Sequence, residues 1–89
     1  MLTIQSTKKF LKDLKRASKR GKNIDDLEHL IDLLQAETPL PPNNKDHPLI
    51  GNWSKHRECH IDPDWLLIYR IDGQSLILER TGSHADLFE

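Results

Sequence analysis

Residues 56–81 read HRECHIDPDWLLIYRIDGQSLILERT, and this stretch decides the fold. Three of its segments are rich in the aliphatic and aromatic residues that favour strands. These segments are His56–Ile61, Trp65–Ile71 and Gln74–Thr81. The turn residues Asp62-Pro63-Asp64 separate the first two segments, and Asp72-Gly73 predicts a tight hairpin between the last two. The stretch therefore predicts an antiparallel meander of three strands.

Two amphipathic helices are predicted upstream of this meander. The first begins after an N-cap at Ser6 or Thr7 and ends at Gly21, and the second begins after Asn23 and ends before Pro39. Apolar residues recur at helical spacing in both helices: Phe10, Leu11, Leu14 and Ala17, then Ile24, Leu27, Leu30, Ile31 and Leu34. We expect a helical hairpin whose apolar faces pack on the sheet.

The flanking segments complete the predicted fold. Thr3 and Ile4 predict a short edge strand, and the prolines of residues 39–53 predict a long loop without regular structure. Ser83 and Asp86 form a capping-box pattern, which predicts a short C-terminal helical turn. The predicted class is α+β, with one domain over residues 1–89 in which an N-terminal helical hairpin packs on a small antiparallel sheet.

Composition narrows the class of protein. Of 89 residues, 36% are hydrophobic and 30% are charged, which predicts a folded, soluble chain rather than a disordered one. No apolar run approaches the roughly 18 residues of a membrane-spanning helix. Residues 1–4 lack the features of a signal peptide, and the single Cys59 cannot form an internal disulfide. We expect a cytoplasmic protein that does not enter a membrane.

Charge is unevenly distributed, although the formal net charge is only −1. Eight of the thirteen basic residues lie between Lys8 and Lys22, and acidic residues follow from Asp25 to Glu37. One interpretation is that these are two solvated helix faces, and another is that the basic face contacts RNA phosphates. The two interpretations are compatible. If the basic face binds RNA, the candidate residues are Lys12, Lys15 and Lys19.

Histidines in the second half of the chain indicate acid–base chemistry on RNA. Cleavage of a phosphodiester by its own 2′-hydroxyl needs a base for that hydroxyl, an acid for the departing 5′-oxygen and cations for the phosphorane. Imidazoles titrate near neutral pH and supply base and acid, while guanidiniums supply positive charge. The candidate catalytic residues are His47, Glu58, His60, Asp64, Arg80 and His84, with Arg57 as a further phosphate contact.

Strand alternation sorts the residues of the first strand. Because successive side chains face opposite ways, Glu58 and His60 share one face. Cys59 and Ile61 share the other face and are expected in the core. Glu58 and His60 are therefore expected on the open face of the sheet.

Two other uses of these residues follow from the same pattern. Zinc has candidate ligands in His47, Cys59, His60 and His84. Adjacent strand residues face opposite ways and no paired ligand motif exists, so we expect no metal and no cofactor. Trp65 either packs in the core or exposes its indole to stack on an unstacked base.

Three motifs carry a resemblance that covers nearly the whole chain. They are KDHPL at residues 45–49, HIDPDWLLIY at residues 60–69 and ERTGSHADLF at residues 79–88. In these motifs the chain resembles the YafQ family, within the RelE/ParE superfamily of bacterial toxins. The resemblance implies a RelE-like fold and the toxin of a type II toxin–antitoxin pair. Such a toxin is a ribosome-dependent endoribonuclease, which enters the A site of the 70S ribosome, among rRNA, and cuts the mRNA codon held there.

The resemblance also implies a partner and an active site. The partner is a small antitoxin protein, usually encoded beside the toxin. The implied site residues are His47, His60, Asp64, Trp65, His84 and Phe88. We expect His47, His60 and Asp64 around the 2′-hydroxyl. His84 then lies near the leaving group, with Trp65 and Phe88 against an unstacked base. Glu58 departs from the family member compared, which has aspartate at that position.

Two further function classes stay open on this pattern. One is a non-enzymatic inhibitor of DNA gyrase on the same fold, as in the ParE-like branch. The other is a metal-dependent hydrolase. A gyrase inhibitor does not need a cluster of histidines and aspartate on its sheet, so the pattern favours the ribonuclease.

Overall fold

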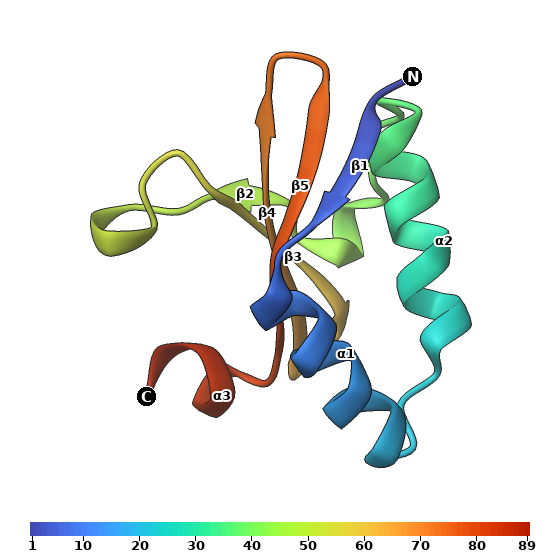
Figure 1. The fold of residues 1–89 in the computed structure, drawn as a ribbon, viewed down its shortest axis with the longest axis vertical. Helices are drawn as coiled ribbons and strands as arrows, with labels where there is room; N and C mark the ends of the chain where they lie inside the picture. The colour runs from blue at the N-terminus through green and yellow to red at the C-terminus, as the bar shows by residue number, and fades with distance from the viewer.

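A five-stranded sheet organises the computed structural model, which describes residues 1–89 (Figure 1). Its strand order is β1-β5-β4-β3-β2. The strands are β1 (Thr3–Ser6), β2 (His47–Pro48), β3 (Arg57–Asp62), β4 (Trp65–Asp72) and β5 (Ser75–Gly82). β3, β4 and β5 form the antiparallel meander predicted from the sequence, and every observed boundary lies within one residue of the predicted one.

β1 makes the sheet mixed rather than wholly antiparallel. The predicted edge strand at Thr3 and Ile4 is confirmed, but it extends to Ser6 and pairs in parallel with β5. Figure 1 shows β1 beside β5, at the edge of the sheet. No hairpin turn joins β1 to β5, so no turn imposes the antiparallel direction that short connections impose on the meander.

β2 is the strand that the sequence did not predict. Residues 39–53 contain two short 3-10 turns, Pro42–Asn44 and Gly51–Trp53, and between them His47 and Pro48 pair with β3. The prediction of a loop without regular structure is therefore wrong at this point. Proline has no backbone N–H to donate to a ladder, so its place in a strand is limited to an edge such as this one.

Three helices complete the fold: α1 (Lys8–Lys19), α2 (Ile24–Gln35) and α3 (His84–Phe88). The predicted N-caps are confirmed, because Thr7 accepts a hydrogen bond from the Phe10 amide and Asn23 accepts one from the Asp25 amide, both at 3.0 Å. Gly21 follows α1 at φ +81°, a conformation that glycine adopts without strain. None of the helices has both the length and the apolar character needed to span a membrane.

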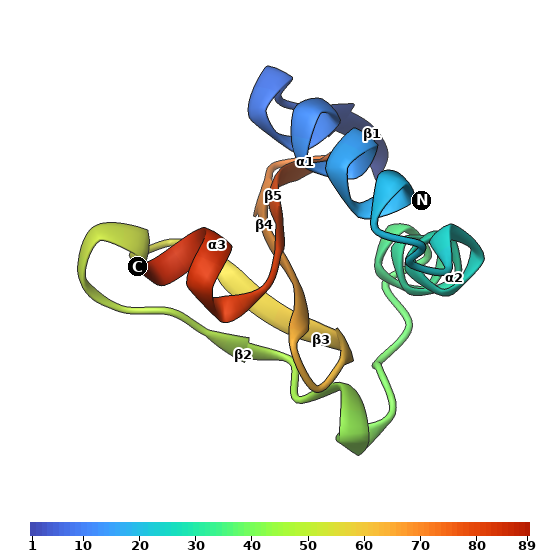
Figure 2. The ribbon, with the colours of Figure 1, turned by 90° about the horizontal axis from the view of Figure 1, so that it is seen from below.

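The main core lies between the sheet and the α1–α2 hairpin. Figure 2 shows α1 and α2 on one side of β4 and β5, with α3 on the other. A second, smaller apolar cluster lies under α3, where Leu87 packs on Leu66 and Ile68 of β4. The middle of β4 is therefore buried on both faces, which explains its unbroken apolar sequence.

Candidate active site

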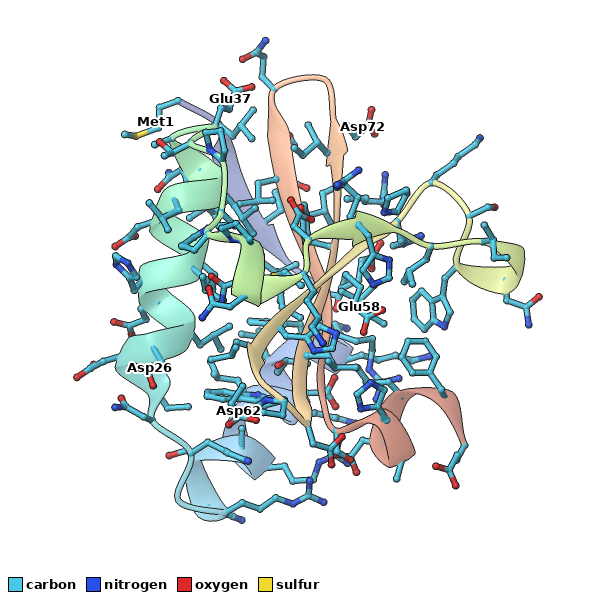
Figure 3. The ribbon with its side chains drawn as sticks, turned by 180° about the vertical axis from the view of Figure 1, so that it is seen from behind. Met1, Asp26, Glu37, Glu58, Asp62 and Asp72 are labelled. Carbon is cyan, nitrogen blue, oxygen red and sulfur yellow. The ribbon has the colours of Figure 1, made fainter.

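Glu58 lies between two histidines on the face of the sheet away from α1 and α2. The pairing of β2 with β3 sets His47 directly across from Glu58, and His60 follows on the same face of β3. The Nε2 atoms of His47 and His60 are each 3.3 Å from a different carboxylate oxygen of Glu58. The Glu58 side chain is only 7% exposed, whereas that of His47 is 48% exposed. Figure 3 labels Glu58 beside β2, across the molecule from Asp26 on α2.

His84 and Asp64 form the second part of the site. Asp64 Oδ1 accepts a hydrogen bond from the His84 amide at 2.9 Å and lies 2.7 Å from His84 Nδ1. These two bonds, the amide bond first, hold the pKa of Asp64 below its usual value. Nδ1 is occupied by the carboxylate, so Nε2 is the ring nitrogen of His84 that remains open to a substrate.

Contact between His60 and His84 joins the two parts. Their ring centroids are 5.7 Å apart and the rings meet edge to face. The ring of Phe88 lies 6.4 Å from that of His84 and Phe88 is 42% exposed. The structure therefore brings together five of the expected catalytic residues and the expected base-flanking phenylalanine in one continuous line.

This arrangement has the groups needed for two proton transfers. A carboxylate next to an imidazole fixes the orientation of the ring and stabilises its protonated form. The pair of histidines around Glu58 and the single histidine on Asp64 have separate carboxylates. One part of the site can thus remove a proton while the other part donates one.

Arg57 is not placed with the histidines. It faces the other side of β3, where its Nε donates to Asp46 Oδ1 at 3.2 Å, and it lies across from Tyr69, a core residue of β4. Strand alternation accounts for this, because Arg57 shares the face of Cys59 and not that of Glu58. The expectation that Arg57 faces the scissile phosphate is therefore not supported.

Arg80 is engaged in an ion pair that the sequence did not indicate. Its Nε and Nη2 donate to the two oxygens of Asp13 on α1, at 2.6 and 3.2 Å, and this bond raises the pKa of Arg80. Asp13 is buried and also accepts from the Thr81 amide. Only Nη1 of Arg80 is left for a phosphate. The clue in the sequence was a single aspartate among the apolar positions of an otherwise basic helix.

Trp65 is a core residue and not a stacking platform. It is only 2% exposed and belongs to the main core with Leu67 and Tyr69, which share its face of β4. The expectation that Trp65 holds an unstacked base is therefore wrong, and the alternative of core packing is confirmed. Lys22 covers the ring at 5.9 Å from its centroid. Phe88 is an accessible aromatic side chain beside His84.

His47, Glu58 and His60 also form a set of potential metal ligands. One donor atom from each lies within 4.8 Å of the others. This set differs from the candidate ligands predicted from the sequence, which included Cys59 and His84 and omitted Glu58, two residues before His60. Cys59 is fully buried on the opposite face, and burial raises the pKa of its thiol to about 12. Imidazole and carboxylate donors suit a divalent transition metal.

The expected RNA-binding lysines are free on the outer face of α1. Lys12, Lys15 and Lys19 are exposed and take part in no ion pair. The arginines of this helix differ, because Arg16 pairs with Asp13 and Arg20 pairs with Asp86. A test of RNA binding by α1 must therefore leave the arginines intact.

Asp46 anchors the segment that carries His47. The Tyr69 hydroxyl donates to Asp46 Oδ1 at 2.6 Å from within the core, and burial raises the pKa of Tyr69. We expect Tyr69→Phe to lower the free energy of unfolding by about 1.5–3 kcal/mol, because it removes a partly buried hydrogen bond to a charged group and keeps the ring. Urea unfolding measures this. Asp46→Asn combined with Tyr69→Phe should be less destabilising than the sum of the two, and an unchanged Tyr69→Phe midpoint would contradict the assignment.

Comparison with known proteins gives a consistent set of similarities. A family model described as "Bacterial toxin of type II toxin-antitoxin system, YafQ" matches residues 2–89. The chain is 46% identical over 86 residues to the mRNA interferase toxin YafQ of Escherichia coli K12, covering 96% of this chain and 94% of that protein.

Two solved structures have the same fold. A metal-bound toxin from Helicobacter pylori superposes with a TM-score of 0.93 at 49% identity, covering 99% of this chain and 100% of that one. The E. coli DinJ-YafQ complex contains a chain that superposes with a TM-score of 0.92 at 43% identity, with full coverage of both. The predicted α+β class and RelE-like architecture are thus confirmed.

Proposed function

This chain belongs to the YafQ family of bacterial toxins of type II toxin–antitoxin systems, and from that premise we propose that it cuts mRNA held in the A site of a 70S ribosome. It is an endoribonuclease of the mRNA interferase class, like its E. coli relative. That relative's name favours the ribonuclease over the alternative of a gyrase inhibitor. In this proposal the substrate is mRNA bound to the ribosome, so the reaction takes place in the cytoplasm.

The line of side chains from His47 to Asp64 is the observation that carries the mechanism. We assign His47 and His60, held by Glu58, to the 2′-hydroxyl, where one imidazole takes its proton. His84 protonates the departing 5′-oxygen. Asp64 belongs with His84 rather than with the 2′-hydroxyl, since it is bonded to the His84 ring and amide. Phe88 flanks an unstacked base.

The reaction is assigned to side chains without a metal. His47, Glu58 and His60 would hold a divalent metal if one bound, and such an ion would supply Lewis-acid chemistry at the phosphate. The imidazoles that would ligate it are the same side chains that the acid–base mechanism assigns to the 2′-hydroxyl. Chelation therefore distinguishes this mechanism from a metal-dependent hydrolase.

An antitoxin is the proposed protein partner. A solved structure of the E. coli relative is that of a DinJ-YafQ complex. We propose that this chain is likewise held by a small antitoxin protein, usually encoded beside the toxin.

Cleavage in a translating extract tests the function. Purified protein added to the extract should produce cuts at codons of the translated message, mapped by primer extension. Naked message should be cut far less, because the A site supplies the position of the codon. Supercoiling by DNA gyrase should be unaffected. Inhibition of gyrase without any cut in the message would overturn the proposal.

The lysine face of α1 is proposed to bind rRNA. We expect replacement of Lys12, Lys15 and Lys19 by glutamine to raise the toxin concentration needed for cleavage and to leave the cut sites unchanged. Each phosphate contact contributes about one unit to the salt dependence of binding, so the log–log slope should fall by about 2–3. Ribosome binding measured across salt concentrations checks this. An altered codon preference at unchanged affinity would contradict a purely phosphate-binding role.

A further inference from the structure

α3 is held in place by tertiary contacts rather than by its own stability. It has five residues, too few for a helix that persists by itself in water. It carries His84 and Phe88, so its position determines the geometry of half of the site. Leu87 packs under it on β4, and Asp64 binds its first residue.

Asp86 supplies a third attachment, from α3 to α1. Its Oδ2 accepts from the Ser83 amide at 3.0 Å and from Arg20 Nη1 at 2.7 Å, while Arg20 Nη2 lies 3.4 Å from Oδ1. Arg16 Nη2 is 3.7 Å away. The side chain of Asp86 is 14% exposed, and the Arg20 bond is the main reason that the pKa of Asp86 lies well below its usual value.

Gly82 closes the remaining side of this carboxylate. A Cβ at Gly82 would lie 2.9 Å from both Cβ and Oδ2 of Asp86, closer than side-chain carbons approach. Asp86 is therefore seated against the backbone of β5, with an arginine fork on its outer side. A forked, charge-assisted pair of this kind fixes orientation as well as distance.

We infer that Asp86 and Arg20 are positioning residues for His84. Asp86 lies two residues after His84 in the same helical turn, so the link to α1 sets the place of the His84 ring relative to Asp64 and His60. Neither Asp86 nor Arg20 needs to touch the RNA for this role. A displacement of about 1 Å in an acid or base is enough to slow a reaction substantially. The inference rests on the proposed function only for its kinetic consequence.

The test compares Arg20→Gln with Lys9→Gln. Both variants remove one positive charge from α1, but Lys9 is exposed and has no ion pair. Single-turnover cleavage of ribosome-bound message gives the rate at saturating toxin and the half-saturating concentration. We expect Arg20→Gln to lower the saturating rate about 10-fold with little change in half-saturation. Lys9→Gln should keep the wild-type rate, and Arg20→Lys should recover part of the loss.

The ring resonances of His84 provide a readout that does not depend on cleavage. In ¹H–¹⁵N spectra of the free protein, Arg20→Gln and Asp86→Asn should both shift the His84 ring signals, and Lys9→Gln should not. If wild-type protein does not cleave, the proposed function fails while the spectra still test the positioning role. If Arg20→Gln matches Lys9→Gln in both saturating rate and His84 signals, the inference is overturned. If Arg20→Gln raises only the half-saturating concentration and keeps the saturating rate, the inference is also overturned, and Arg20 is assigned to RNA binding instead.

Discussion

Replacing His84 by alanine is expected to slow mRNA cleavage at saturating toxin by about 10²–10⁴-fold, the usual cost of losing a positioned acid or base. The Asp64 carboxylate binds both the backbone amide of His84 and Nδ1 of its ring, which leaves Nε2 of the ring open. No neighbouring imidazole can replace it, because His60 approaches edge to face and is bound to Glu58. Rates on ribosome-bound message measure the loss.

His29→Ala is the matched control for this prediction. His29 is an exposed histidine of α2, on the helix side of the molecule, and its side chain makes no hydrogen bond or ion pair. Its removal should leave the rate unchanged. His84→Ala should bind ribosomes normally. If His84→Ala arrests growth at wild-type strength with mRNA cleavage intact, His84 does not have the assigned role.

A single 2′-O-methyl or 2′-deoxy nucleotide at the cut is expected to abolish cleavage of that bond. In the proposed reaction an imidazole takes the proton of the 2′-hydroxyl and the 2′-oxygen attacks the phosphorus. The bond from phosphorus to the 5′-oxygen then breaks, and His84 donates a proton to that oxygen. The product must carry a 2′,3′-cyclic phosphate or the 3′-phosphate formed when it opens. Without the hydroxyl no nucleophile is present, so protein side chains cannot compensate. Primer extension and end-group analysis of the fragments check both statements.

The same modification one nucleotide away from the cut is the control, and it should leave cleavage in place. EDTA should not stop the reaction when polyamines keep the ribosomes intact. Cutting of the modified bond would refute the 2′-hydroxyl mechanism. Loss of cutting in EDTA, with restoration by a divalent metal, would instead assign His47, Glu58 and His60 to metal binding.

The parts of the fold that were predicted correctly depend on neighbours in sequence. Turn residues set the β3–β4–β5 meander, and the side chains of Thr7, Asn23 and Ser83 cap helices that begin at the next residue. The parallel pairing of β1 and the two-residue β2 were not predicted. Both depend on a partner strand that no local pattern specifies.

The candidate site divides in the same way. His47, His60, His84 and Asp64 were predicted from their residue types and from the family resemblance, and the structure brings them together. The ion pair of Arg80 was not predicted, because its partner Asp13 lies 67 positions earlier in the chain. The burial of Trp65 was left open for a related reason, since the face of a strand that becomes core depends on which helices cover it.

The parallel pairing of β1 with β5 has a consequence for how the protein assembles. It joins parts of the chain that are far apart, as in the bond from Thr7 to the carbonyl of Glu79, 72 positions later. Because long-range closure costs more chain entropy than a hairpin or a helical turn, we expect this pairing to form late in folding. The link from Arg20 to Asp86 spans 66 positions, so we expect it to form late for the same reason. By contrast, His47, Glu58 and His60 come from neighbouring strands, so transient opening of β1 and α1 would loosen His84 while leaving these three together.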